Sequence, residues 1–214
     1  MAKAVKSDSP TGIGRGQART RLARRAVVDA ARSLFLERGY AATTVEAISK
    51  RSDVPPATVY RLFASKLGIL KALLDTSIAG DDQPLSLQQR PEVASLFAET
   101  DRRKLLAGFA EVTAAINQRT SDVYSVLVSA AGSDPAAAEL LDQVRKQRDR
   151  GQARIARSLA RGHQLRAGLR ERDAADVIHA LMAPELYRLF VGDRGWTAGR
   201  YEQWLATTLI QQLT

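Results

Sequence analysis

The sequence predicts an all-α protein built from an N-terminal domain of three short helices, a linking helix and a C-terminal helical bundle. Apolar residues recur at helical spacing along most of the chain, and no segment shows the alternating pattern of a strand. Two turns interrupt this pattern between residues 23 and 63 and divide the stretch into three amphipathic helices. We expect residues 1–18 to form a flexible basic arm, residues 19–66 the three-helix domain, and residues 67–214 the linking helix and bundle.

The first predicted helix ends at Gly39, where glycine tolerates the left-handed backbone of a helix stop. Its apolar face contains Val27, Ala30, Ala31, Leu34 and Phe35. The second helix is predicted to open at Thr43, and Glu46 three residues later forms a capping box with it. Its inward face contains Val45, Ala47 and Ile48. Both helices are therefore expected to contribute to one small core.

A turn at Ser52 and Asp53 precedes a third predicted helix over Pro55–Phe63, because proline is tolerated in the first helical turn. Its packing face contains Val59, Leu62 and Phe63. The residues that remain available to a partner are Pro56, Ala57, Thr58, Tyr60 and Arg61. A small helix face with polar tips fits the major groove of DNA. The sequence therefore predicts a helix-turn-helix DNA-binding domain.

The string FLERGYAATTVEAISKRSDVPPATVYRLFASKLGIL resembles the N-terminal domain of TetR-family transcriptional regulators. The positions in register are Gly39, Tyr40, Thr43, Thr44, Val45, Ile48, Val54, Thr58, Val59, Tyr60, Phe63, Ser65 and Lys66. The resemblance implies phosphate contacts by Thr44, Thr58, Tyr60 and Lys66. It also implies that the helix with Pro56, Ala57 and Arg61 enters the major groove. Together with Val45, these residues form the predicted DNA-binding site.

Three positions depart from the family pattern. Ser52-Asp53 replaces the usual Ala-Gly turn, but aspartate tolerates the left-handed conformation better than most residues, so we expect the turn to survive. Pro55 replaces a serine that commonly caps the recognition helix, and the fixed φ of proline partly offsets the lost hydrogen bond. Leu67 replaces an acidic residue, which removes a favourable carboxylate from the first turn of the fourth helix.

The excess of positive charge lies in the N-terminal third of the chain. Residues 1–75 contain 14 basic and 6 acidic side chains, whereas the remainder contains 18 basic and 17 acidic ones. Because phosphate binding by proteins depends on basic residues that release counterions, this distribution favours DNA as a partner over a basic surface that only aids solubility. Arg15 and Arg19 on the predicted arm either reach a minor groove or have no role.

Composition excludes several classes of protein. The chain has 214 residues and no cysteine, so disulfides and thiolate metal sites are excluded. Without a bilayer-length apolar stretch or a signal-peptide core, we expect a cytoplasmic protein with no membrane partner. His163, in a predicted loop, and His179 have no metal-ligand or nucleophile pattern around them, so we expect no catalytic residue, metal or cofactor, and no enzyme. The charge of His179 could couple pH to dimer packing.

The remainder of the chain is predicted to be helical. The linking helix ends before Gly80, and a polar connection covers Asp81–Pro91. A helix from Asp101 is followed by a shorter one through Tyr124 and Leu127, and after a loop at residues 132–135 another helix runs to about residue 161. The solvated face of the last of these contains Arg145, Lys146, Arg148, Arg150, Arg154 and Arg157. Two further helices cover residues 172–191 and 197–213.

By the same resemblance, the middle helices enclose an effector pocket and the last two helices pair with their copies. The candidate pocket residues are Phe97, Phe109, Ile116, Tyr124, Leu127, Val144, Met182 and Tyr187. Their mostly apolar character favours a small hydrophobic or amphipathic effector. The candidate dimer residues are Ile178, Leu186, Phe190, Tyr201, Trp204, Leu205 and Leu209. For both sets a simpler alternative stays open, in which the side chains only pack within the monomer.

The predicted function is a ligand-responsive repressor that binds a palindromic double-stranded DNA operator as a homodimer, through its Pro55–Phe63 helices. Effector binding would tilt the fourth helix and release the DNA. Two alternatives belong to other classes: a helical ligand-binding or interaction protein without sequence-specific DNA binding, and an architectural DNA binder. Activation instead of repression also stays open, because the same docking serves either output.

Overall fold

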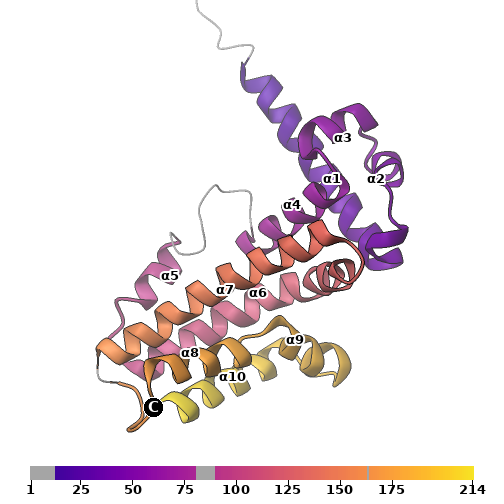
Figure 1. Ribbon diagram of the computed structural model, residues 1–214. Helices are drawn as coiled ribbons and strands as arrows, with labels where there is room; N and C mark the ends of the chain where they lie inside the picture. Colours follow the sequence, from indigo (N-terminus) through magenta and orange to yellow (C-terminus); the bar gives the residue numbers. More distant parts are fainter. Residues whose placement is uncertain (1–12, 81–89, 163) are drawn as a thin grey trace, which may run out of the picture.

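The computed structural model describes residues 13–80, 90–162 and 164–214, and every regular element in these ranges is a helix (Figure 1). The predicted all-α fold is therefore confirmed. Helices α1 (Ile13–Ala42), α2 (Val45–Ser52) and α3 (Pro56–Phe63) form one end of the molecule, and α4 (Lys66–Ala79) leads from them toward the larger bundle. The predicted His163 loop position and most of the predicted polar connection lie outside the described residues.

The first helix begins earlier than predicted. Residues 1–12 of the predicted arm lie outside the described residues. Because α1 starts at Ile13, residues 13–18 belong to the helix, and the prediction that they form part of the arm was wrong. The helix is interrupted at Gly39, whose φ of 78° lies in the region that favours glycine. The predicted stop at this residue is confirmed.

The residue that caps α2 is the second of two adjacent threonines, whereas the first was predicted. The side chain of Thr44, not Thr43, accepts a hydrogen bond from the Ala47 amide and caps α2. Thr43 is buried, and its hydroxyl donates to the backbone carbonyls of Leu34 at 3.2 Å and Gly39 at 2.8 Å. The predicted capping box at Thr43 was therefore wrong by one residue, because Thr43 closes the end of α1 instead.

The long antiparallel pair of the bundle is formed by α6 (Arg102–Ala131) and α7 (Pro135–Arg161). The carboxylates of Asp101 and Asp134 cap their N-termini by accepting backbone N–H groups. The predicted break before Tyr124 does not exist, because Thr120 stays in the helix and its hydroxyl donates to the Ile116 carbonyl at 2.9 Å. A short helix, α5 (Pro91–Leu96), packs beside α6 and was not predicted.

The C-terminal segment also differs from its prediction. The expected helix over residues 172–191 is divided into α8 (Glu171–Leu181), α9 (Pro184–Tyr187) and a π-helical segment (Arg188–Asp193). Pro184 explains the division, since proline starts a new helix more readily than it continues an old one. The last helix, α10 (Ala198–Leu213), is capped by Thr197 as its predicted start requires and packs chiefly against α6.

The molecule has two hydrophobic cores. One joins the N-terminal helices to α4 and to the adjoining parts of α6 and α7, with Phe35, Ile48, Leu70 and Leu127 among its members. The other joins α6, α7, α8 and α10. The first core contains residues from both sides of residue 66, where we expect the boundary between the two domains. The packing is therefore continuous across this boundary. A movement of α4 would therefore change the packing in both halves of the chain.

Candidate nucleic-acid interface and effector cavity

The turn between α2 and α3 holds the candidate DNA-reading helix in place. Asp53 takes the left-handed conformation, with a φ of 53°, so the predicted tolerance of aspartate at this turn is confirmed. The hydroxyl of the buried Ser49 donates to the Val54 carbonyl at 2.6 Å. Val59 is buried against α2 and α1, which fixes the rotation of α3 about its own axis. No side chain caps α3 at Pro55, as expected.

One face of α3 is exposed to solvent. Pro56, Ala57, Tyr60 and Arg61 are exposed and Thr58 is half-buried, whereas Val59 and Phe63 on the other face are buried. Thr44 is exposed at the start of α2 beside this region. Val45 differs from the other candidates because only 6% of its surface is exposed, so its side chain belongs to the core and only its backbone can contact a partner.

Lys66 has an intramolecular partner. Its ammonium donates to the Tyr40 backbone carbonyl at 2.7 Å and lies 4.1 Å from the centre of the Tyr40 ring. Desolvation lowers the pKa of Lys66, and the negative charge of Asp134 acts in the opposite direction. The Tyr40 hydroxyl in turn donates to Asp134 at 3.5 Å, and burial together with this carboxylate raises the pKa of Tyr40 to about 12. Asp134 thus connects the start of α7 to the N-terminal domain.

We expect Lys66→Met to lower the free energy of unfolding by about 2 kcal/mol, because it removes a charged hydrogen bond to a partly buried carbonyl. Lys71→Met is the matched control on the same helix. Lys71 pairs with Asp75 at 2.7 Å, but both side chains are more than half exposed, so its loss should cost less than about 1 kcal/mol. Urea unfolding of both variants checks this. Equal destabilisation by the two substitutions would contradict a structural role for Lys66.

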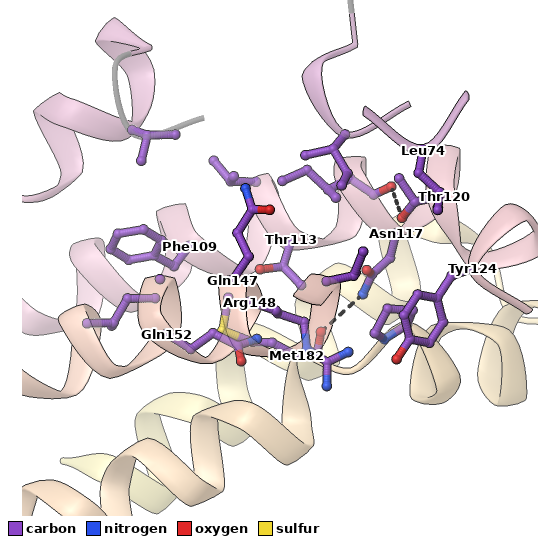
Figure 2. Close-up of a pocket in the computed structure, with 18 of the residues that line it drawn as sticks. Leu74, Phe109, Thr113, Asn117, Thr120, Tyr124, Gln147, Arg148, Gln152 and Met182 are labelled. Carbon is purple, nitrogen blue, oxygen red and sulfur yellow. Dashed lines mark hydrogen bonds between the residues drawn. The ribbon is translucent and has the colours of Figure 1, made fainter. Parts of the chain in front are cut away.

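A cavity of about 180 Å³ lies between α4, α5, α6 and α7 (Figure 2). Six of the eight candidate pocket residues line it: Phe97, Phe109, Ile116, Tyr124, Val144 and Met182. Leu127 and Tyr187 do not line this cavity. Leu127 is buried in the first core, and Tyr187 packs edge-on against Tyr201 with the ring centres 4.9 Å apart. For these two residues the alternative of core packing is correct.

Polar side chains that were not predicted from the sequence also line the cavity. They are Thr113, Asn117 and Thr120 on α6, and Gln147, Arg148 and Gln152 on α7 (Figure 2). Arg148 was expected on the solvated face of α7, but it is half-buried in the cavity wall. It falls in the helical repeat set by Leu141, Val144 and Ile155, and that repeat was the sequence signal for its inward position.

His179 joins two of these polar residues. Its Nδ1 lies 2.8 Å from the Gln152 side-chain oxygen, and its Nε2 lies 2.9 Å from Arg148 Nη2. Since an arginine can only donate, Nε2 accepts and the proton of a neutral ring lies on Nδ1. Burial lowers the pKa of His179, and Arg148 lowers it further, while Asp149, Glu185 and Asp176 act in the opposite direction. This network favours the neutral imidazole.

A pH dependence follows from the lowered pKa of His179. The unfolded chain, in which the ring has its ordinary pKa of 6.5, binds a proton more readily than the folded chain does. The free energy of unfolding should therefore fall as the pH drops below about 6.5. Urea unfolding at about pH 5.5 and about pH 7.5 measures this fall, and His179→Gln should make it smaller. If the variant shows the same fall, other groups cause it.

The candidate dimer residues separate into two groups. Ile178, Tyr201, Leu205 and Leu209 are fully buried within the monomer, so their side chains are not available to a second chain in this fold, and their assignment is corrected. Leu186, Phe190 and Trp204 are half-buried, and Leu189 next to them is exposed. The Phe190 and Trp204 rings lie 4.6 Å apart between centres. Part of the predicted apolar face therefore remains accessible on the surface near α9 and α10.

Among residues 13–80, 90–162 and 164–214, no group of three or more His, Asp or Glu side chains is arranged to hold a metal ion. None of the helices in these ranges is both long and apolar enough to span a membrane.

The N-terminal domain is similar to known proteins in its sequence. Residues 27–73 match the family model described as bacterial regulatory proteins, tetR family. The HTH-type transcriptional regulator YvkB of Bacillus subtilis (strain 168), itself uncharacterized, is 42% identical over 48 residues, which are 22% of this chain and 25% of that protein. The HTH-type transcriptional regulator TcmR of Streptomyces glaucescens is 37% identical over 83 residues, 39% of this chain and 36% of that protein. The matches thus span about a quarter to a third of these relatives.

The resemblance of the whole fold extends further than that of the sequence. The transcriptional regulator FadR from Bacillus subtilis, solved in complex with stearoyl-CoA, has a TM-score of 0.70 at 17% identity. The likeness covers 89% of this chain and 99% of that one. At this identity it shows a shared fold. These three proteins are described as transcriptional regulators and not as enzymes, in agreement with the prediction that this chain is no enzyme.

Proposed function

We propose that this chain, a member of the TetR family of transcriptional regulators, is a ligand-responsive repressor that binds a palindromic DNA operator as a homodimer. The observation that carries the proposal is the exposed face of α3, which a buried packing face and two turns hold on the surface of a basic domain. A rigidly held helix of this kind can enter a major groove. An exposed helix face without such support would lose this geometry.

The proposed DNA contacts follow from the exposure of each side chain. Pro56, Ala57 and Arg61 would face base edges, and Thr58 and Tyr60 would contact phosphates. Thr44 would meet the backbone beside them, joined by the amide of Val45 at the start of α2. Lys66 would contribute a phosphate contact only if its ammonium also turns outward from the Tyr40 carbonyl.

The proposed response to a ligand depends on α4. Leu74 and Ile78 of this helix line the cavity, and Arg119 of α6 donates to the Ser77 carbonyl at 3.0 Å near its C-terminal end. The N-terminal end of α4 adjoins α3 through the Ser65 cap. A ligand that fits the cavity in only one position of α4 would shift the recognition helix, provided that it binds the two arrangements with different affinity.

The proposed homodimer would use the accessible part of the apolar face near α9 and α10, with Leu186, Phe190 and Trp204. A dimer is needed on physical grounds, because one short helix reads few base pairs, whereas two helices one turn of DNA apart can read a palindrome. Exposed Leu189 lies beside these residues and enlarges the face.

Selection from a randomised DNA library at moderate salt, followed by sequencing, tests the function. The expected result is an enriched palindrome whose half-sites are about one helical turn apart. A reporter gene under the enriched sequence should be expressed less when the protein is present. Uniform binding of all DNA would favour an architectural binder, absence of binding would favour an interaction protein, and higher expression would identify an activator.

A further inference from the structure

Two polar side chains of the cavity wall are buried and yet keep unused hydrogen-bonding groups. Thr113 on α6 and Gln152 on α7 each have only 6% of their surface exposed, and both line the cavity (Figure 2). The Thr113 hydroxyl and the Gln152 side-chain nitrogen form no hydrogen bond within the part of the chain that the structure describes. Both atoms keep some accessible surface, whereas Nε and Nη1 of Arg148 are fully buried. The two unused groups are therefore open to a ligand in the cavity.

A chain of hydrogen bonds determines which group Gln152 presents. Because an arginine can only donate, Arg148 Nη2 donates to His179 Nε2 at 2.9 Å, and the proton of the neutral ring lies on Nδ1. The Nδ1–H group then donates to the Gln152 side-chain oxygen at 2.8 Å. The amide nitrogen remains, and an amide nitrogen can only donate. Gln152 therefore offers the ligand N–H donors.

Thr113 supplies a second donor at the same level of the bundle. A threonine inside a helix often donates to the carbonyl four residues before it, as Thr120 does to Ile116 at 2.9 Å (Figure 2). The Thr113 hydroxyl makes no such bond among the described residues, so its proton is free. Thr113 lies about five turns before the end of α6, and Gln152 lies about five turns after the start of α7. Since these helices are antiparallel and consecutive, the two donors lie opposite each other.

The charges around the cavity favour an uncharged ligand. Arg148 is the only charged side chain among the described residues that line it. Its Nη2 is used by His179, and its Nε and Nη1 are closed to a ligand. A Glu185 carboxylate oxygen lies 3.7 Å from Nη1 and offsets the charge of the guanidinium. A charged ligand would therefore lose its hydration without gaining an ionic partner.

The remaining walls specify the body of the ligand. Phe97, Phe109, Ile116 and Met182 give the cavity an apolar interior. Its volume of about 180 Å³ is close to that of an engineered cavity of roughly 150 Å³ that holds benzene. The space therefore suits a single ring or a short aliphatic chain that carries one small polar group.

We propose that the cavity binds a small uncharged carbonyl compound, whose oxygen accepts hydrogen bonds from the Gln152 amide and the Thr113 hydroxyl. A carbonyl oxygen has two lone pairs and no proton, so it satisfies both donors and requires no acceptor from the wall. An alcohol would also have to place its own proton. This inference rests on the proposed function, because it names the chemical class of the effector.

Isothermal titration calorimetry without DNA tests the proposal, with acetophenone and 2-heptanone as ketones. At least one ketone should bind with a Kd below about 1 mM. Benzoate and 1-phenylethylamine, which carry opposite charges, should bind at least about 10-fold more weakly than acetophenone, and 1-phenylethanol should also bind more weakly. Thr113→Val and Gln152→Met should each weaken ketone binding by about 5-fold. Gln143→Met, which changes an exposed glutamine on the same helix, should leave it unchanged.

The outcomes separate this inference from the proposed function. The carbonyl site would be overturned if neither ketone binds, if benzoate, 1-phenylethylamine or 1-phenylethanol binds as tightly as acetophenone, or if Thr113→Val leaves the affinity unchanged. Circular dichroism shows whether Gln152→Met, which also removes a partner of His179, is folded, and an unchanged affinity of the folded variant would overturn the site too. Ketone binding that depends on Thr113 in a chain that selects no DNA would support the inference and overturn the repressor.

Discussion

Replacing Tyr60 and Arg61 together with alanine is expected to lower the affinity for the selected DNA by about 100-fold or more. Both side chains are exposed on α3, and Tyr60 has 46% of its surface accessible. Because the packing face of the helix, with Val59 and Phe63, is untouched, the variant should keep its folded structure. The loss would therefore come from the DNA contacts and not from unfolding.

The two single variants distinguish base reading from phosphate binding. Tyr60→Ala should weaken binding to all DNA sequences by a similar factor, whereas Arg61→Ala should weaken binding to the selected sequence most and relax its preference. Fluorescence anisotropy with the selected duplex and a scrambled duplex, at several salt concentrations, measures both effects. Arg172→Ala removes an equal charge from the exposed surface of α8 and should change neither. If Arg61→Ala weakens both duplexes equally, α3 does not read bases through this residue.

The exposed face of α3 was predictable from the sequence. Helical spacing identified Val59 and Phe63 as the packing side, and the structure buries both. The same spacing identified the core of α1, and the composition of the turn identified Asp53 as a left-handed residue. These features depend on neighbours within a few residues, so local pattern and backbone preference are enough to infer them.

Features that depend on a choice between equivalent neighbours were not predictable in the same way. Thr43 and Thr44 can each cap a helix, and only the position of α1 assigns Thr43 to the Leu34 and Gly39 carbonyls. The break at Pro184 could have been predicted, since proline disfavours a helix interior. The apolar repeat on both sides of Pro184 instead led to the prediction of one continuous helix. Local rules ranked the wrong alternative in both places.

Arg148 is a further residue whose position was predicted wrongly from the sequence. A run of arginines on a helix is usually solvated, yet Arg148 and Gln152 occupy the same face as the apolar residues of α7. Their position was implied by the helical repeat, whereas their partner His179 lies 31 residues from Arg148 and was brought to them only by the fold. The cavity and its donors are thus properties of the tertiary structure.

Gly68 lies at the corner between α3 and α4, directly against backbone atoms of Phe63. A Cβ atom at residue 68 would overlap the carbonyl oxygen of Phe63. The two helices approach so closely because Ala64 takes a positive φ of 62° and Ser65 then caps α4. Since backbone atoms cannot move aside as a side chain can, any larger residue at this position must push α3 and α4 apart.

We expect Gly68→Ala to lower the free energy of unfolding by about 3 kcal/mol, although alanine normally stabilises a helix relative to glycine by about 1 kcal/mol. Gly199→Ala is the control: Gly199 also lies in the first turn of a helix, but a Cβ there would meet nothing within 4 Å. Urea unfolding compares the two. Equal stability of the two variants would show that α3 and α4 can move apart at little cost. The expected difference measures how firmly α4 holds the recognition helix. Any transmission from the cavity to the DNA requires such a rigid connection.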